Sequence, residues 1–178
     1  MNDSGSTFSR RRLLQVGLFG SAALAGAGLL GTLSGCSAER AATGFVWLRD
    51  GDLPLLRRLA RVMLDGATPP EKLAVSVQGT LASLDQGLAH LSPVVAKQVR
   101  QLFDLLSLPL TRGPLTGVWG SWEQARNAEV KAFLQRWENS SIDLLKQGHA
   151  SLQQMILMAW YGRPESWAHC GYPGPPTV

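Results

Sequence analysis

The chain has 178 residues, of which 45% are hydrophobic and 17% are charged, and its formal net charge is +4. This length suits one modest domain, and the apolar content is too high for a disordered chain. Outside residues 1–35 there are 14 basic and 12 acidic residues. The basic residues cluster only at Arg57, Arg58 and Arg61, on a short predicted helix. The weak net charge of that part disfavours nucleic-acid binding.

Residues 1–35 have the pattern of an export signal, with a basic start, an apolar middle from Val16 to Leu33 and a small-residue end. Paired arginines before the apolar stretch indicate the twin-arginine route, which carries proteins that are already folded. The motif departs from the usual S-R-R-x-F-L-K pattern only at Leu13 and Gln15, and its matching part is Ser9, Arg10, Arg11, Leu13 and Leu14.

The leader ends in Leu33-Ser34-Gly35-Cys36, which has the pattern of a lipobox. We therefore expect cleavage before a lipidated Cys36, a tether over residues 36–51, and a periplasmic protein that its N-terminal lipid attaches to the membrane. The alternatives are ordinary cleavage and an uncleaved anchor, since 18 apolar residues are just long enough to cross a bilayer. With Cys36 lipidated, Cys170 has no partner in the chain. We expect a buried thiol there rather than an intermolecular disulfide.

Helical spacing of apolar residues dominates the rest of the chain. Asp52 is expected to cap a first helix that ends near Asp65. Thr68 is expected to cap a second helix that continues to Leu91, and Ser92 a third that ends near Ser107.

Two prolines and three glycines in Leu108–Gly120 predict an apolar loop, which folds back on the core or meets a partner. A capping-box pattern at Ser121 predicts a helix that ends near Glu138, with a break near Asn127 allowed. The last long helix is expected over residues 142–161, and its second half, apolar on all sides, should be buried in a core or an interface.

Residues 164–178 are expected to form a short turn of helix and then an extended arm, because the end is rich in Gly and Pro. The predicted fold is all-α, an irregular bundle of about five helices over residues 52–163 with apolar Pro/Gly-rich connections.

Sequence patterns for a phosphate-binding loop, c-type haem, an Fe–S cluster or a di-iron site do not occur in the chain. His169 and Cys170 are adjacent, which gives poor metal geometry, and His149 stands alone. The sequence therefore predicts no catalytic residue, no metal and no cofactor bound by this chain. Its tryptophans are expected in the core or in a protein interface rather than around a small ligand.

Several features together resemble a known family. They are the twin-arginine leader, the small helical body, the segment Leu108–Trp122, and an ending with Ala159-Trp160-Tyr161-Gly162, Ser166-Trp167 and Gly171-Tyr172-Pro173-Gly174-Pro175. These resemble the small accessory subunits of periplasmic GMC-type flavin dehydrogenases, the gluconate 2-dehydrogenase subunit 3 group, over most of residues 50–176. The lipobox departs from many members of that group.

The resemblance implies that a large partner subunit holds FAD and oxidises an alcohol or a sugar, often with a cytochrome c subunit as a further partner. The small subunit would hold no redox centre and would supply the signal for the twin-arginine translocase. The residues expected at the partner interface are Trp119, Trp122, Trp160, Tyr161, Trp167, Cys170, Tyr172 and Pro173. Two alternatives stay open: a stand-alone periplasmic lipoprotein that binds a small apolar ligand, and an enzyme that uses His169 and Cys170.

Overall fold

The computed structural model describes residues 40–174, with the exception of the side chain of His169. The export motif at Arg10 and Arg11, the lipobox at Cys36 and the last four residues of the expected arm lie outside that part. Most of the described residues are helical, and no strand occurs among them. The all-α prediction is therefore confirmed.

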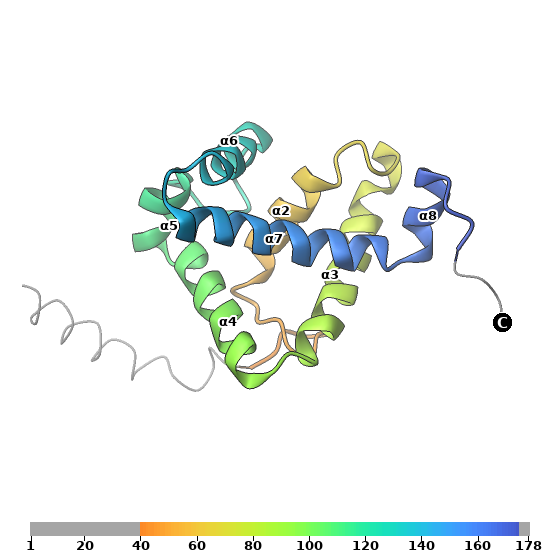
Figure 1. Cartoon of the computed structure of the whole chain (residues 1–178), viewed down its shortest axis with the longest axis horizontal. Helices are drawn as coiled ribbons and strands as arrows, with labels where there is room; N and C mark the ends of the chain where they lie inside the picture. The colour runs from red at the N-terminus through yellow and green to blue at the C-terminus, as the bar shows by residue number, and fades with distance from the viewer. Residues whose placement is uncertain (1–39, 175–178) are drawn as a thin grey trace, which may run out of the picture. The chain divides into compact units, whose positions relative to one another are not determined.

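Seven α-helices and one short 3-10 helix follow each other along the described chain (Figure 1). They are α2 (Leu53–Met63), η1 (Pro70–Lys72), α3 (Leu73–Ala89), α4 (Pro93–Ser107), α5 (Pro109–Thr116), α6 (Asn127–Glu138), α7 (Asp143–Tyr161) and α8 (Pro164–Cys170). The five longest correspond to the predicted bundle, and the short helices α5 and α8 are additional.

Helix α2 lies at the centre of the core and packs against α3, α4, α6 and α7. Its residues Leu55, Leu56, Leu59 and Ala60 are at most 1% exposed. They follow the i, i+1, i+4, i+5 spacing that places a broad apolar stripe on a helix. In Figure 1, α7 crosses α2 and extends from α6 to α3. Helix α7 therefore covers one side of α2 and contacts all three helices.

Helix α5 corrects the prediction of a loop over residues 108–120. Pro109 stands in its first turn, where the missing amide hydrogen costs no hydrogen bond. Gly117, at φ 74°, then ends the helix and donates its amide to the carbonyl of Gly113 at 2.7 Å. A left-handed glycine of this kind is a common helix stop. Good end signals and packing thus outweigh the poor helix propensity of Gly113 and Pro114.

The predicted caps were wrong in detail. Asp52 stands at the start of α2, but its carboxylate accepts hydrogen bonds from Arg49 and not from the helix amides. Thr68 lies 3.1 Å from the hydroxyl of Ser76, and α3 begins only at Leu73. Polar side chains at a predicted cap can find other partners in the tertiary structure, and here they do.

Helix α6 begins at Asn127 rather than at Ser121. The carboxylate of Glu129 accepts a hydrogen bond from the amide of Arg126 at 2.7 Å, as in one half of a capping box. Hydrogen bonds from the side chain and backbone of Arg126 hold the pKa of Glu129 below its ordinary value. The real start signal of this helix is therefore Arg126–Glu129.

The end of the chain also differs from the expectation. In the second half of α7, Ile156, Ala159 and Trp160 are buried, but Met158 and Tyr161 are 67% and 51% exposed. Helix α8 is the short helical segment expected there, but it extends over seven residues, and Gly171 ends it at φ 73°. The described part of the arm is therefore only residues 171–174.

Candidate partner-binding surface

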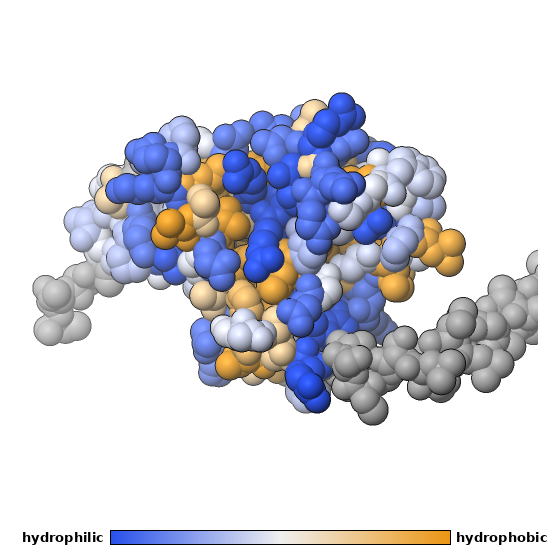
Figure 2. Space-filling view, turned by 180° about the vertical axis from the view of Figure 1, so that it is seen from behind, coloured by the Kyte–Doolittle hydropathy of each residue, from blue (hydrophilic) through white to orange (hydrophobic). Residues whose placement is uncertain are grey.

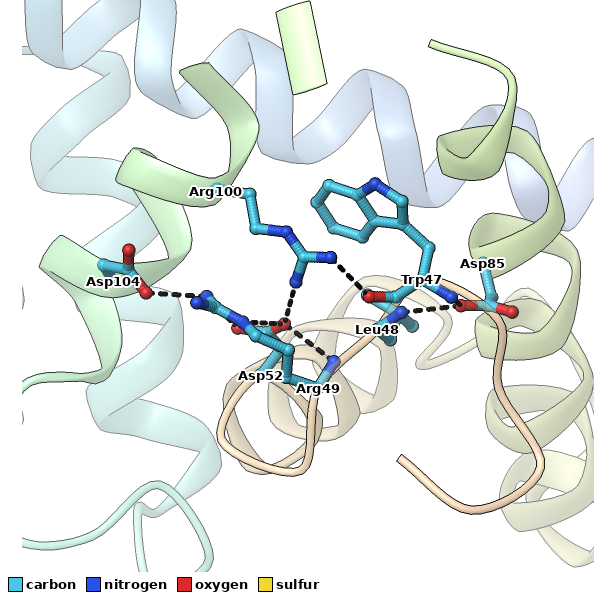
Figure 3. A network of polar contacts seen from close by, with 7 residues as sticks. All are labelled: Trp47, Leu48, Arg49, Asp52, Asp85, Arg100 and Asp104. Carbon is cyan, nitrogen blue, oxygen red and sulfur yellow. Dashed lines mark hydrogen bonds and ion pairs between the residues drawn. The ribbon is translucent and has the colours of Figure 1, made fainter. Parts of the chain in front are cut away.

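A buried carboxylate holds the segment that precedes α2. Asp85 of α3, which is 2% exposed, accepts hydrogen bonds from the backbone amides of Val46, Trp47 and Leu48 at 2.8, 2.9 and 2.7 Å. Figure 3 shows Trp47 and Leu48 at this carboxylate. This segment has no regular secondary structure, so its amides need another acceptor once they leave water. Asp85 supplies that acceptor and fixes the segment on α3.

The same segment is tied to α4 by two arginines. Arg49 binds Asp52 at 2.8 Å and Asp104 of α4 at 2.6 Å. Arg100 donates to the carbonyl of Trp47 at 2.8 Å, and its guanidinium carbon lies 3.8 Å from the centroid of the Trp47 ring. Figure 3 shows that the carboxylates of Asp52, Asp85 and Asp104 point toward arginine side chains and backbone amides of the same chain. This network therefore joins α2, α3 and α4.

The charge of Arg49 is well supported within this network. Burial by itself would lower the pKa of Arg49, but the hydrogen bonds and the negative charges of Asp52 and Asp104 outweigh it. The net effect raises the pKa above its ordinary value, so the guanidinium stays charged at any pH at which the protein is folded.

The described residues contain no group of three His, Cys, Asp or Glu side chains that could hold a metal ion. His149 is half-buried on α7. Cys170 is exposed, which corrects the expectation of a buried thiol. It stands in the last turn of α8, where its sulfur lies 3.4 Å from the carbonyl oxygen of Trp167.

None of the helices in the described part is long and apolar enough to span a membrane.

Two of the aromatic residues expected at an interface lie in the core instead. Trp122 and Trp160 are each only 2% exposed. The indole of Trp122 donates to the carbonyl of Leu106 at 2.8 Å, and its ring lies 6.0 Å from that of Phe133. A buried indole with its N–H satisfied is a stable core element. These two side chains therefore stabilise this chain and present no surface to a partner.

Another part of the expected interface gathers around α8. The rings of Trp167 and Tyr172 meet edge to face at 5.7 Å. The indole of Trp167 donates to the carbonyl of Tyr161 at 2.9 Å. Tyr161 and Tyr172 are about half exposed, and Cys170 and Pro173 are exposed as well. The structure thus brings five predicted residues together at one end of α7.

Trp119 belongs to a separate surface, and its side chain is 78% exposed. Its ring lies against α5 at Gly113, where an added Cβ would come within 2.5 Å of the ring carbon Cε3. Three further exposed leucines occupy the same region, where α4 turns into α5. We call this set the corner patch: Leu105, Leu108, Leu110 and Trp119.

An apolar groove adjoins the corner patch between α4 and α7 and has a volume of about 410 Å³. Leu105 belongs to both features, and Leu144, 74% exposed, lies on the α7 side. The apolar lining is Leu102, Leu105, Leu115, Trp137, Leu144 and Leu145. Gln98, Gln101, Gln147 and Ser151 are the polar residues of the lining. An apolar centre with a polar rim is the usual anatomy of a protein-binding surface.

The sequence pointed to only part of this surface. The apolar composition of Leu108–Gly120 is a usable signal for the corner patch, but Leu105 and Leu144 lie on helices, where apolar spacing alone does not separate exposed leucines from buried ones. On the face seen in Figure 2, apolar side chains form several groups separated by hydrophilic ones.

No protein-family model, curated protein or solved structure matches this chain.

Proposed function

We propose that this chain is a non-catalytic accessory subunit of a periplasmic oxidoreductase. In this role it escorts a folded, FAD-containing GMC-type dehydrogenase through the twin-arginine route and holds it at the membrane by a lipid on Cys36. The flavin belongs to the partner, and a cytochrome c subunit completes the complex in the family that the sequence resembles. The observation that carries the proposal is the corner patch with its adjoining groove.

The physical argument rests on exposed apolar area. Leu110, Trp119 and Leu144 are 87%, 78% and 74% exposed. Burying a leucine side chain fully is worth about 1.5–3 kcal/mol, so a partner that covers these residues gains several such contributions. Adjoining exposed apolar residues on a soluble domain mark interaction sites, and tryptophan is enriched among the residues that dominate binding energy.

The leader supports the same role. A twin-arginine motif at Arg10 and Arg11 suits a cargo that folds in the cytoplasm, often around a cofactor. The described residues bring together no candidate metal ligands. A folded, flavin-loaded partner is the cargo that would explain such a signal on this chain.

Co-purification tests the proposal. The full chain, with an affinity tag joined to Val178 by a flexible linker, is produced in its native host and purified from detergent-solubilised membranes. We expect the eluate to show a flavin absorbance spectrum and dye-linked dehydrogenase activity toward an alcohol or a sugar. Trp119→Ala should weaken retention of the flavoprotein about tenfold, the effect typical of a residue that dominates an interface.

The matched control is Val75→Ser, which alters another exposed apolar residue, 74% exposed, outside the corner patch and the groove. Substitutions at such exposed positions change stability by only about 0.5 kcal/mol, so both variants should fold normally. An eluate without flavin and without dehydrogenase activity rejects the escort role.

The alternative is a stand-alone periplasmic lipoprotein that binds a small apolar ligand. One observation favours it: the α4–α7 groove, at about 410 Å³, falls within the size range of small-molecule sites. In that case the chain purifies without a flavoprotein, and an apolar ligand found with it is lost when Leu144→Gln makes the groove polar.

A further inference from the structure

One end of the bundle carries a small apolar projection next to the point where the described chain begins. Val46, Val94 and Val95 are 61%, 70% and 41% exposed, and we call these three residues the valine tip. Figure 1 shows the segment at the start of the described chain beside the lower ends of α3 and α4. Hydrogen bonds from this segment to Asp85 of α3 and from Arg100 of α4 hold it there.

The two stretches of sequence that carry the valine tip contain no charged residue, and the charged groups that contact the first of them, Asp85 and Arg100, come from α3 and α4. Residues 41–48 and 86–96 contain no Asp, Glu, Lys or Arg, although 17% of the chain is charged. The next charged residue along α4 is the exposed Lys97, one turn from the valines. An apolar tip with no charged residue of its own and a lysine at its border suits a lipid surface, where the ammonium group can reach the phosphates.

Several backbone amides at this end also have hydrogen-bond acceptors within the protein, so they do not depend on water. An unpaired amide costs several kcal/mol in the bilayer core, and part of that cost applies at its surface. The carboxylate of Asp85 binds the amides of Val46, Trp47 and Leu48. The amides of Ala42 and Phe45 donate to the carbonyls of Leu48 and Ala42. The segment can therefore approach lipid without leaving these donors unpaired.

The length of the chain decides which end of the domain faces the membrane. Only four residues, 37–40, lie between Cys36 and Ala41, which begins the compact unit, so five Cα–Cα steps join the two. Fully extended, they span at most about 18 Å, and the headgroup layer takes about 5–8 Å of that. The remaining distance of about 10–13 Å is close to the diameter of one helix. A lipid on Cys36 would thus hold this end against the bilayer and leave no room for a second domain between them.

We infer that the valine tip inserts into the headgroup region of the bilayer that holds Cys36 and so sets the orientation of the domain. The inference rests on the lipid anchor of the proposed function. The lipid supplies the affinity, because two acyl chains suffice for stable anchoring, and the three valines supply the orientation. The corner patch lies at the opposite end of α4 and on α5, and it stays accessible to the flavoprotein.

Lipid quenching of a fluorescent probe tests this orientation. The full chain with Cys170→Ser is purified from its native host, and a single labelling site is added as Val94→Cys or, as the control, Val75→Cys. Val75 is also exposed, at 74%, but lies near the other end of α3. Each chain carries an NBD probe and is reconstituted into vesicles of phosphatidylethanolamine and phosphatidylglycerol that contain nitroxide-labelled lipids.

We expect the probe at position 94 to be quenched at least about twofold more strongly than the probe at position 75, since only the former sits in the headgroup layer. Equal quenching at the two positions, on a chain whose mass shows the lipid on Cys36, overturns the insertion and leaves the anchor intact. A chain whose Cys36 carries no lipid and which is absent from the membrane fraction overturns the anchor and this inference together.

Discussion

At the scale of single residues, Asp85 is the most consequential polar group in the described part. It replaces water as the acceptor for three consecutive amides, and the sequence around it, with Leu81, Leu84 and Leu88, marks only a buried helix face. An aspartate within such an apolar stripe indicates that hydrogen-bond donors lie next to its carboxylate, because burying an unpaired charge costs too much free energy. The identity of its partners required the structure.

Replacing Asp85 by asparagine should destabilise the fold. Asp85→Asn keeps the size of the side chain but directs an NH2 group toward backbone donors and removes the negative charge. We expect a loss of about 2–4 kcal/mol in the free energy of unfolding, since hydrogen bonds to a charged, buried acceptor are among the stronger ones. Urea denaturation followed by circular dichroism measures it.

The control for this substitution is Asp50→Asn, because Asp50 is exposed. It should change stability by no more than about 0.5 kcal/mol. If the two variants unfold at the same urea concentration, the carboxylate of Asp85 is not what holds the Val46–Leu48 segment in place.

The tryptophans show how far residue-level prediction extends. The sequence predicted core or interface for them, and the structure contains both kinds. Trp122 and Trp160 are buried and Trp119 is exposed. Aromatic residues fit either setting, so only the packing of neighbouring helices separates them.

At the scale of elements, some glycines allow two helices to pack closely, and composition alone does not separate these from glycines in open positions. Gly148 of α7 faces Trp137 of α6, and a Cβ added there would lie 2.6 Å from the ring carbon Cζ3. Trp137 is 3% exposed and its indole donates to the carbonyl of Leu115 at 2.9 Å. The ring therefore cannot retreat without loss of that hydrogen bond.

Two glycine-to-alanine substitutions should consequently have opposite effects. Gly148→Ala should destabilise the protein by about 1–3 kcal/mol through overpacking, despite the higher helix propensity of alanine. Gly87→Ala in α3, where an added Cβ meets nothing within 4 Å, should stabilise it by about 0.5–1 kcal/mol. Thermal unfolding compares the two, and a rise in Tm for Gly148→Ala would mean that the α6–α7 contact is looser than described.

Helix α5 is the element that sequence patterns described least well. Prolines and glycines predicted a loop at Leu108–Gly120, yet the segment folds into a helix between Pro109 and Thr116. Its hydroxyl groups support it, since Thr116 donates to the carbonyl of Arg112 at 2.7 Å and accepts from the amide of Val118 at 3.1 Å. Each such local hydrogen bond contributes little to the stability of the helix, so several of them are needed together.

At the scale of the whole molecule, the proposals assign different surfaces to different partners. In these proposals, the valine tip contacts lipid, and the corner patch with the α4–α7 groove contacts the flavoprotein. Neither surface uses Trp122 or Trp160, which belong to the core. This division lets one small domain hold a larger enzyme at the membrane.

The escort role predicts that the export signal of this chain controls the location of another protein. Arg10→Lys combined with Arg11→Lys should leave the flavoprotein in the cytoplasm, because the twin-arginine route depends on those residues. Cell fractionation with a dehydrogenase assay measures it. The control pair Arg57→Lys and Arg61→Lys changes two exposed arginines of α2 and should leave export intact. Undiminished periplasmic activity in the first variant would contradict the hitch-hiking role.

The sequence by itself determined the helical class and the approximate places of the five long helices, because apolar periodicity is a local property that every residue of a stripe repeats. It also supplied the export motif and the candidate lipid site at Cys36. Only the tertiary structure decided which apolar residues stay exposed, as at Leu110 and Val94, and which polar ones are buried, as at Asp85. Exposure depends on how helices distant in sequence pack together, and no local pattern carries that information.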